Sequence, residues 1–226
     1  MLARSLPNLL GVFRILTTPL LVWLVLRNDA PGFYGAVVLL LIMAASDIAD
    51  GPIARKLQVV SPLGVFLDTI SDKIFVAGAL IPMVEVGLLS SWIALLIIVR
   101  DFAVSGLRSF AAAEGVVISA RQWGKQKLVI TVTAIVWLLL AAAFNGSTSP
   151  AFEPSAGRSG LAYGFSWLLS LWPIPMFLAV VWTIFSGVEY FWKAWPLLSG
   201  KIAPEAKPAP IAPPAKPTTA KPDRSR

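Results

Sequence analysis

The sequence predicts an all-α integral membrane protein with six transmembrane helices and a polar cavity on the cytoplasmic side. Of its 226 residues, 57% are hydrophobic and only 14% are charged, whereas soluble domains average about 25% charged residues. The hydrophobic residues form runs long enough to cross a bilayer. Residues 1–199 are therefore the predicted membrane domain. Residues 200–226, rich in Pro, Ala and Lys, are a predicted disordered cytoplasmic tail.

The predicted spans cover approximately residues 6–26, 33–49, 64–86, 88–107, 128–144 and 172–195. Polar turns at 27–32 and 56–63 separate the first three. Residues 145–171 contain more Gly, Ser and Pro, which predicts a loop with a short interfacial helix at 161–171. Arg14 lies inside the first span. We expect it to face protein or the cytoplasmic rim, because a charged side chain in lipid is costly.

The basic residues predict the orientation of these spans. They gather at the N-terminus, in the second and fourth connections and in the tail, whereas the opposite side has only Arg27 and Arg158. Cytoplasmic loops carry the excess of Lys and Arg, so both termini are predicted to lie in the cytoplasm and the protein in the cell (inner) membrane. The net charge of +7 is also expected to attract anionic lipids and phosphorylated substrates.

Four of the 12 acidic residues lie within residues 46–73: Asp47, Asp50, Asp68 and Asp72. Spacings of three and four residues place each pair on one helix face, and a short turn makes the two helices antiparallel neighbours. Four carboxylates facing one space need cations, because their mutual repulsion would otherwise protonate some of them. Two divalent metal ions fit this arrangement. The chain has no His and no Cys, and an oxygen-only site suits Mg²⁺ or Mn²⁺.

Small residues flank these carboxylates. Gly51, Ala54 and Gly64 would let a bulky ligand approach the backbone, and Arg55 offers a planar donor for phosphate oxygens. The alternative without a catalytic function is a helix pair held by Asp–Arg and Asp–Lys pairs. Pro52 directly follows Gly51, and its ring clashes with the carbonyl of Ile48. We therefore expect a kink or a helix end near residues 48–52.

The pattern Asp47-x₂-Asp50-Gly51-x₂-Ala54-Arg55-x₈-Gly64-x₃-Asp68-x₃-Asp72 resembles the signature of the CDP-alcohol phosphotransferase family. The resemblance extends over about residues 5–195 and implies a six-helix homodimeric membrane enzyme. It implies that Asp47, Asp50 and Asp68 bind two metal ions, and that Asp72 is both metal ligand and general base. It also implies a CDP-lipid site at Gly51, Arg55 and Ser61, with Asn8 near the cytidine and Ala54 and Gly64 lining the same space.

A second cluster, the basic residues of 100–127, is the candidate acceptor site. Arg100 and Arg108 are eight residues apart and lie on nearly one helix face, and Lys125 and Lys127 open the fifth span. Together they are predicted to bind the phosphate of the acceptor. The alternatives are ordinary basic residues at helix ends, or a pairing of Arg100 with Asp101 or with an aspartate of the site.

Four segments, residues 7–19, 98–108, 115–117 and 123–127, resemble the phosphatidylglycerolphosphate synthases of that family, although Asp101 stands where Glu is more common. This resemblance implies transfer of the phosphatidyl group from CDP-diacylglycerol to sn-glycerol 3-phosphate, giving phosphatidylglycerol phosphate and CMP. Other acceptors remain open within the family: phosphatidylglycerol as in cardiolipin synthesis, inositol phosphate or serine. Outside it, the alternative is a cation transporter. Membrane lipids are expected partners, and nucleic acid is not.

Overall fold

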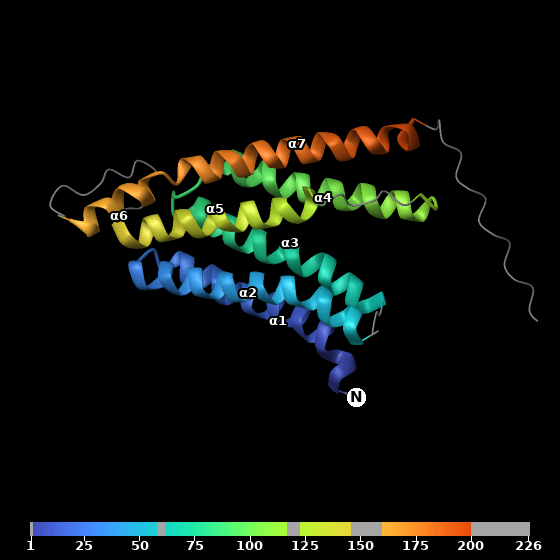
Figure 1. Cartoon of the computed structure of the whole chain (residues 1–226), viewed down its shortest axis with the longest axis horizontal. Helices are drawn as coiled ribbons and strands as arrows, with labels where there is room; N and C mark the ends of the chain where they lie inside the picture. The colour runs from blue at the N-terminus through green and yellow to red at the C-terminus, as the bar shows by residue number, and fades with distance from the viewer. Residues whose placement is uncertain (1, 58–61, 117–122, 146–159, 200–226) are drawn as a thin grey trace, which may run out of the picture.

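The computed structural model describes residues 2–57, 62–116, 123–145 and 160–199; side-chain surroundings are described there except at 2–8, 49–57, 62, 63, 65 and 123–125. The described residues form helices and no strand, which confirms the all-α fold class (Figure 1). The helices are α1 Leu2–Leu26, α2 Ala30–Leu57, α3 Pro62–Glu85, α4 Ser91–Ala113, α5 Trp123–Asn145, α6 Leu161–Ser170 and α7 Pro173–Leu198. The predicted tail lies outside the described residues.

The hydrophobicity of the helices identifies a membrane protein. Four segments are long and apolar enough to cross a bilayer: Leu9–Leu26, Ala30–Ile48, Gln126–Asn145 and Leu161–Leu198. Helices α3 and α4 have 24 and 23 residues, but they carry more charged side chains. Large apolar side chains face outward; Leu16 is 72% exposed and Trp92 78%. Such a surface is stable in lipid and not in water, whereas the count of six spans remains a prediction.

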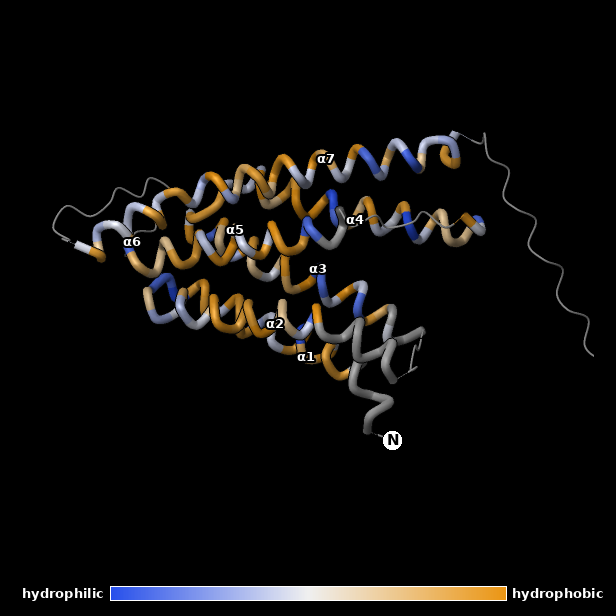
Figure 2. Tube along the Cα trace, in the orientation of Figure 1, coloured by the Kyte–Doolittle hydropathy of each residue, from blue (hydrophilic) through white to orange (hydrophobic). Residues whose placement is uncertain are grey.

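The long helices alternate in direction and close into a ring (Figure 1). In space the order is α1, α2, α5, α7, α4 and α3, and α3 packs against α1 to complete it. The starts of α1, α3 and α5 and the ends of α2, α4 and α7 therefore lie at one end of the bundle. Hydrophilic residues of α3, α4 and α7 are found in the halves nearest that end (Figure 2). The ring thus collects polar residues of these three helices at one end.

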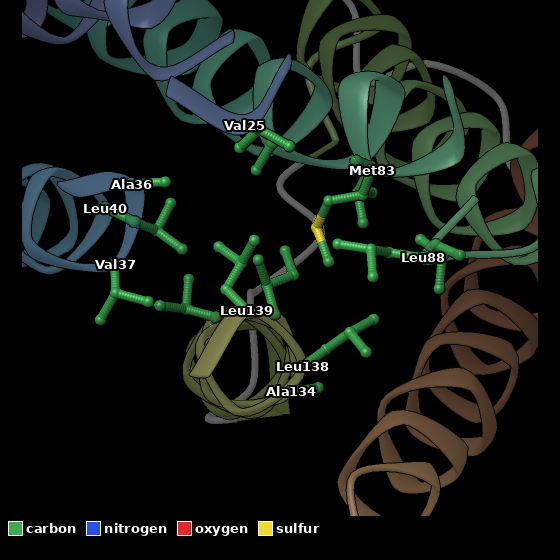
Figure 3. Close-up of a cluster of buried hydrophobic side chains, with 14 of the residues drawn as sticks. Val25, Ala36, Val37, Leu40, Met83, Leu88, Ala134, Leu138 and Leu139 are labelled. Carbon is green, nitrogen blue, oxygen red and sulfur yellow. The ribbon is translucent and has the colours of Figure 1, made fainter. Parts of the chain in front are cut away.

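The opposite half of the ring holds the hydrophobic core (Figure 3). Leu138 and Leu139 of α5 are fully buried and lie among Leu40 of α2, Met83 of α3 and Leu88 just beyond α3. These side chains come from helices far apart in the sequence. The core therefore fixes α5 against α2 and α3, and it sets the spacing of the helices at the polar end.

Two sequence predictions about helix ends have clear outcomes. The short helix predicted at 161–171 is confirmed as α6, where Ser166 Oγ donates a hydrogen bond of 2.7 Å to Asn145 Oδ1 at the end of α5.

The helix end predicted near residues 48–52 is wrong, because α2 continues through Pro52 to Leu57. A proline removes one backbone hydrogen bond, and a helix held on both sides of it continues. A kink there stays a prediction.

The turn between α1 and α2 is held by Asp29. Arg27 Nη2 donates to Asp29 Oδ2 and the Gly32 amide donates to Asp29 Oδ1, each at 2.7 Å. The hydrogen bond from Arg27, with that from Gly32, lowers the pKa of Asp29 below its ordinary value. A side chain at position 32 would place its Cβ 2.5 Å from the carbonyl oxygen of Leu24. Glycine therefore allows α1 and α2 to approach closely at this turn.

Candidate active site

Three of the four signature aspartates come together at the polar end of the ring. Asp47 lies on α2, and Asp68 and Asp72 lie one turn apart on α3. One carboxylate oxygen from each lies within 4.8 Å of the others. The Asp68 side chain is 55% exposed, whereas that of Asp47 is 14% exposed. The cluster is therefore buried on one side and open on the other. The side chain of Asp50 lies outside the described surroundings.

Arg14 of α1 lies against this cluster and is completely buried. Its Nη1 is paired with Asp47 Oδ1, and its Nη2 lies 3.1 Å from Asp68 Oδ1. Arg14 faces protein, as its place in an apolar span predicts, but its role in the carboxylate cluster was not predicted. The sequence contained a signal for this role. An arginine within a span needs a carboxylate, and the aspartates lie in the neighbouring spans.

Close packing of α1 on α3 brings Arg14 to the aspartates. A Cβ at Gly78 would lie 2.3 Å from Thr18 Cγ2, and a Cβ at Gly11 would lie 3.3 Å from Leu67 Cβ. Thr18 Oγ1 also donates a 2.7 Å hydrogen bond to the Arg14 carbonyl oxygen one turn earlier. Glycines on both helices thus let α1 approach α3 near the middle of the bundle.

The three carboxylates fit a hard divalent cation. One Arg14 guanidinium against the carboxylates of Asp47, Asp68 and Asp72 leaves an excess of negative charge. Within the part of the chain that the structure describes, Oδ1 of Asp72 is buried and accepts no hydrogen bond. A buried acceptor without a partner is costly. Oxygen ligands of this kind are those that Mg²⁺ and Mn²⁺ prefer.

All predicted CDP-lipid residues except Ser61 lie on helices at the same end of the bundle. Gly64 is half-buried in the first turn of α3, one turn before Asp68. Gly51, Ala54 and Arg55 lie on the last turns of α2, and Asn8 on the second turn of α1. Their side-chain contacts are outside the described surroundings, and Ser61 lies outside the described residues altogether. The backbones of the other five residues lie at the same end of the bundle as the carboxylates. Their roles stay predictions.

A second charged cluster links α4 and α5. Asp101 Oδ1 accepts a hydrogen bond of 3.2 Å from Arg100 Nη1 and is paired with Lys127 Nζ. The pairing of Arg100 with Asp101, one of the alternatives that the sequence left open, is thus observed. Arg108 is exposed two turns later on α4, and the side chain of Lys125 lies outside the described surroundings.

The outer face of α4 and α7 contains a groove of about 680 Å³. Arg100 lies at one end of it, and the remaining lining is apolar or aromatic, including Leu107, Phe191 and Trp195. No aspartate of the carboxylate cluster lines this groove. Apart from Arg100, the chemistry of this lining suits hydrocarbon.

Comparison with known proteins agrees with this geometry. The family model described as CDP-alcohol phosphatidyltransferase matches residues 4–185. A Bacillus subtilis protein named CDP-diacylglycerol–glycerol-3-phosphate 3-phosphatidyltransferase is 37% identical over 161 residues, which cover 71% of this chain and 74% of the relative. Proteins of the same name from Mycoplasma genitalium and Pseudomonas fluorescens are each 31% identical, covering 83% and 86% of this chain and 82% and 92% of the relatives.

A rice protein named cardiolipin synthase (CMP-forming) is 29% identical over 195 residues, which cover 80% of this chain and 58% of the relative. Relatives with two different names therefore match this chain. The family match extends over most of the chain and includes every signature aspartate. On this evidence, the chain belongs to the CDP-alcohol phosphatidyltransferase family.

Proposed function

We propose that the protein transfers the phosphatidyl group of CDP-diacylglycerol to sn-glycerol 3-phosphate, forming phosphatidylglycerol phosphate and releasing CMP. The observation that carries this proposal is the carboxylate cluster of Asp47, Asp68 and Asp72, in which one oxygen of each residue lies within 4.8 Å of the others. The names of the bacterial relatives support the choice of acceptor.

Asp72 is the proposed general base. Its buried and unpartnered Oδ1 can take the proton of the 1-hydroxyl of the acceptor. The hydroxyl oxygen then forms a bond to the β-phosphorus, the bond from that phosphorus to the oxygen of CMP breaks, and CMP leaves. Arg55 is proposed to donate hydrogen bonds to the phosphate oxygens, with Asn8, Gly51, Ala54, Ser61 and Gly64 lining the CDP-lipid site.

Asp47, Asp50, Asp68 and Asp72 are the proposed metal ligands for two ions, Mg²⁺ or Mn²⁺. When bound, these ions would neutralise the pyrophosphate and stabilise the attacking and leaving oxygens. Removal of divalent ions with a chelator should abolish CMP release, and titration of each ion back should restore it. Calorimetric titration of the chelated protein would give the number of ions. Full activity in the chelated protein would contradict this assignment.

The acceptor is tested with the purified full chain in mixed micelles. CMP release is followed with CDP-diacylglycerol, Mg²⁺ and one acceptor at a time: glycerol 3-phosphate, phosphatidylglycerol, inositol phosphate or serine. The proposed function predicts rapid release with glycerol 3-phosphate alone. Release with phosphatidylglycerol instead would assign cardiolipin synthesis, the activity in the name of the rice relative. No release with any acceptor would leave cation transport as the alternative.

The carboxylate cluster is proposed to face the cytoplasm from the cell (inner) membrane. The excess of basic residues at that end of the bundle supports this orientation. The chain contains no cysteine, so single cysteines at Asn28 and Ser199 can be labelled without a background. In intact cells, an impermeant reagent should label the first and not the second. A homodimer is the proposed assembly, tested by light scattering of the detergent-solubilised protein.

A further inference from the structure

Asp101 has a position in the structure that its isolated place in the sequence does not reveal. One of its oxygens, Oδ1, contacts both Arg100 Nη1 and Lys127 Nζ. The side chains of Lys127, Arg100 and Asp101 are only 6%, 12% and 17% exposed. A single carboxylate oxygen therefore holds two cationic groups from two helices next to each other. The two groups are close enough for one phosphate group to contact both.

The charges of this cluster are not balanced. Two cations face one carboxylate, and an excess charge inside a membrane protein is costly unless an anion accompanies it. Among the described residues, Nε and Nη2 of Arg100 are buried and donate no hydrogen bond. Buried donors without acceptors are costly. The cluster thus has both a net positive charge and unused donors, which is what an anionic ligand requires.

Residues of α5 and α7 provide two further features of this cluster. The hydroxyl of Thr131, one turn beyond Lys127 on the same face of α5, is buried and has no hydrogen-bond partner among the described residues. On α7, Gly187 leaves room for the Arg100 stem, since a Cβ there would lie 3.1 Å from Arg100 Cγ. The ring of Tyr190 lies under the guanidinium, with its centroid 5.9 Å from Cζ. Residues of α4, α5 and α7 thus fix the cluster.

We infer that Asp101 is a positioning residue that holds Arg100 and Lys127 as a pair for the phosphate of the acceptor alcohol. The carboxylate holds both cations close together, while Nε and Nη2 of Arg100 stay available to the ligand. Asp101 thereby sets the preference for a phosphorylated acceptor without touching the reacting atoms. This inference rests on the proposed function, because it assigns the cluster to the acceptor and not to the CDP-lipid.

The test compares kinetic constants of the full-length Asp101→Asn and Asp101→Glu variants with those of the unmodified protein. In Asp101→Asn, the KM for glycerol 3-phosphate should rise about tenfold or more, the expected effect of losing charge-assisted contacts. The KM for CDP-diacylglycerol should stay within about twofold, since the carboxylate cluster is intact. Asp101→Glu retains the charge and should recover most of the loss. Glu189→Gln, which changes an ion pair on α7, is the matched control and should behave normally.

A purely structural role for Asp101 would raise both KM values or lower kcat without a preference between substrates, and that result would overturn the inference. Should Asp101→Asn fail to fold, Gly187→Ala displaces the Arg100 stem while it retains every charge. Its KM for glycerol 3-phosphate should rise selectively, whereas Gly106→Ala, where a Cβ meets no atom within 4 Å, should not change it. An unchanged KM in Gly187→Ala would contradict the inference. Activity of the unmodified protein with glycerol 3-phosphate tests the proposed function separately.

Discussion

Replacing Arg14 with Met would remove the one described cation that contacts two of the clustered carboxylates. The side chain of Arg14 is fully buried and that of its partner Asp47 is 14% exposed. Breaking a buried pair by removing one partner costs about 3–5 kcal/mol, because the remaining charge is left uncompensated. The second partner, Asp68, is 55% exposed, and screening by solvent reduces its contribution to at most about 1 kcal/mol. The pair with Asp47 therefore dominates the expected loss.

The assay is thermal unfolding of Arg14→Met and of the unmodified protein in detergent, with a chelator and with saturating Mg²⁺. A loss of about 3–5 kcal/mol lowers Tm by about 6–20 °C in a chain of this size. Bound divalent ions would compensate the same carboxylates, so the difference in Tm between the two proteins should shrink when Mg²⁺ is added. Arg27→Met, which breaks an exposed pair with Asp29, is the matched control.

Two results would refute this reasoning about Arg14. A Tm of Arg14→Met within about 1 °C of the unmodified protein in chelator would show that the buried pair contributes little. A deficit of the same size with and without Mg²⁺ would show that the ions do not bind the carboxylates that Arg14 contacts. A large loss in Arg27→Met would mean that the assay does not separate buried from exposed pairs.

The remaining predictions concern the base and the packing that positions it. Asp72→Asn should lower CMP release by about a hundredfold or more with little change in Tm, as expected for a general base and metal ligand; activity within tenfold of normal, compared with Glu189→Gln, would contradict the role. Gly78→Ala should lower Tm relative to Gly106→Ala, because its Cβ meets Thr18 Cγ2 at 2.3 Å and overpacking costs about 1–3 kcal/mol; equal Tm values would contradict this. Leu138→Ala should cost about 2–5 kcal/mol through a cavity in the core, and a loss below about 1 kcal/mol would mean that neighbours close the cavity.

Local patterns were sufficient to predict the helices and the carboxylate cluster. Hydrophobic runs identified the long helices, and the composition of residues 145–171 identified the short helix before α7. The spacing of Asp68 and Asp72, with a short connection to the helix of Asp47, predicted that these side chains would meet. Each of these inferences depends on residues close in sequence, where helical geometry fixes the outcome.

Contacts between distant helices were not predictable in the same way. The ring order depends on which apolar faces pack together, and nearly uniform hydrophobic surfaces do not specify it. Arg14 reaches Asp47 and Asp68 because α1 approaches α3 at Gly78. The expected helix end at Pro52 is wrong because α2 continues to Leu57 despite the low helix propensity of proline. The shared contact of Arg100 and Lys127 with Asp101 likewise depends on how α4 and α5 are placed.

The pairing of Arg14 with Asp47 also bears on how the chain enters the membrane. The two residues lie on the first and second helices, which are joined by a turn of three residues. Each charge is costly in lipid by itself, and the cost falls when opposite charges enter together. The first two helices therefore form a hairpin that contains its own neutralising pair. It can insert as a unit, and the site is then completed when α3 brings Asp68 and Asp72 to a cation that is already in place.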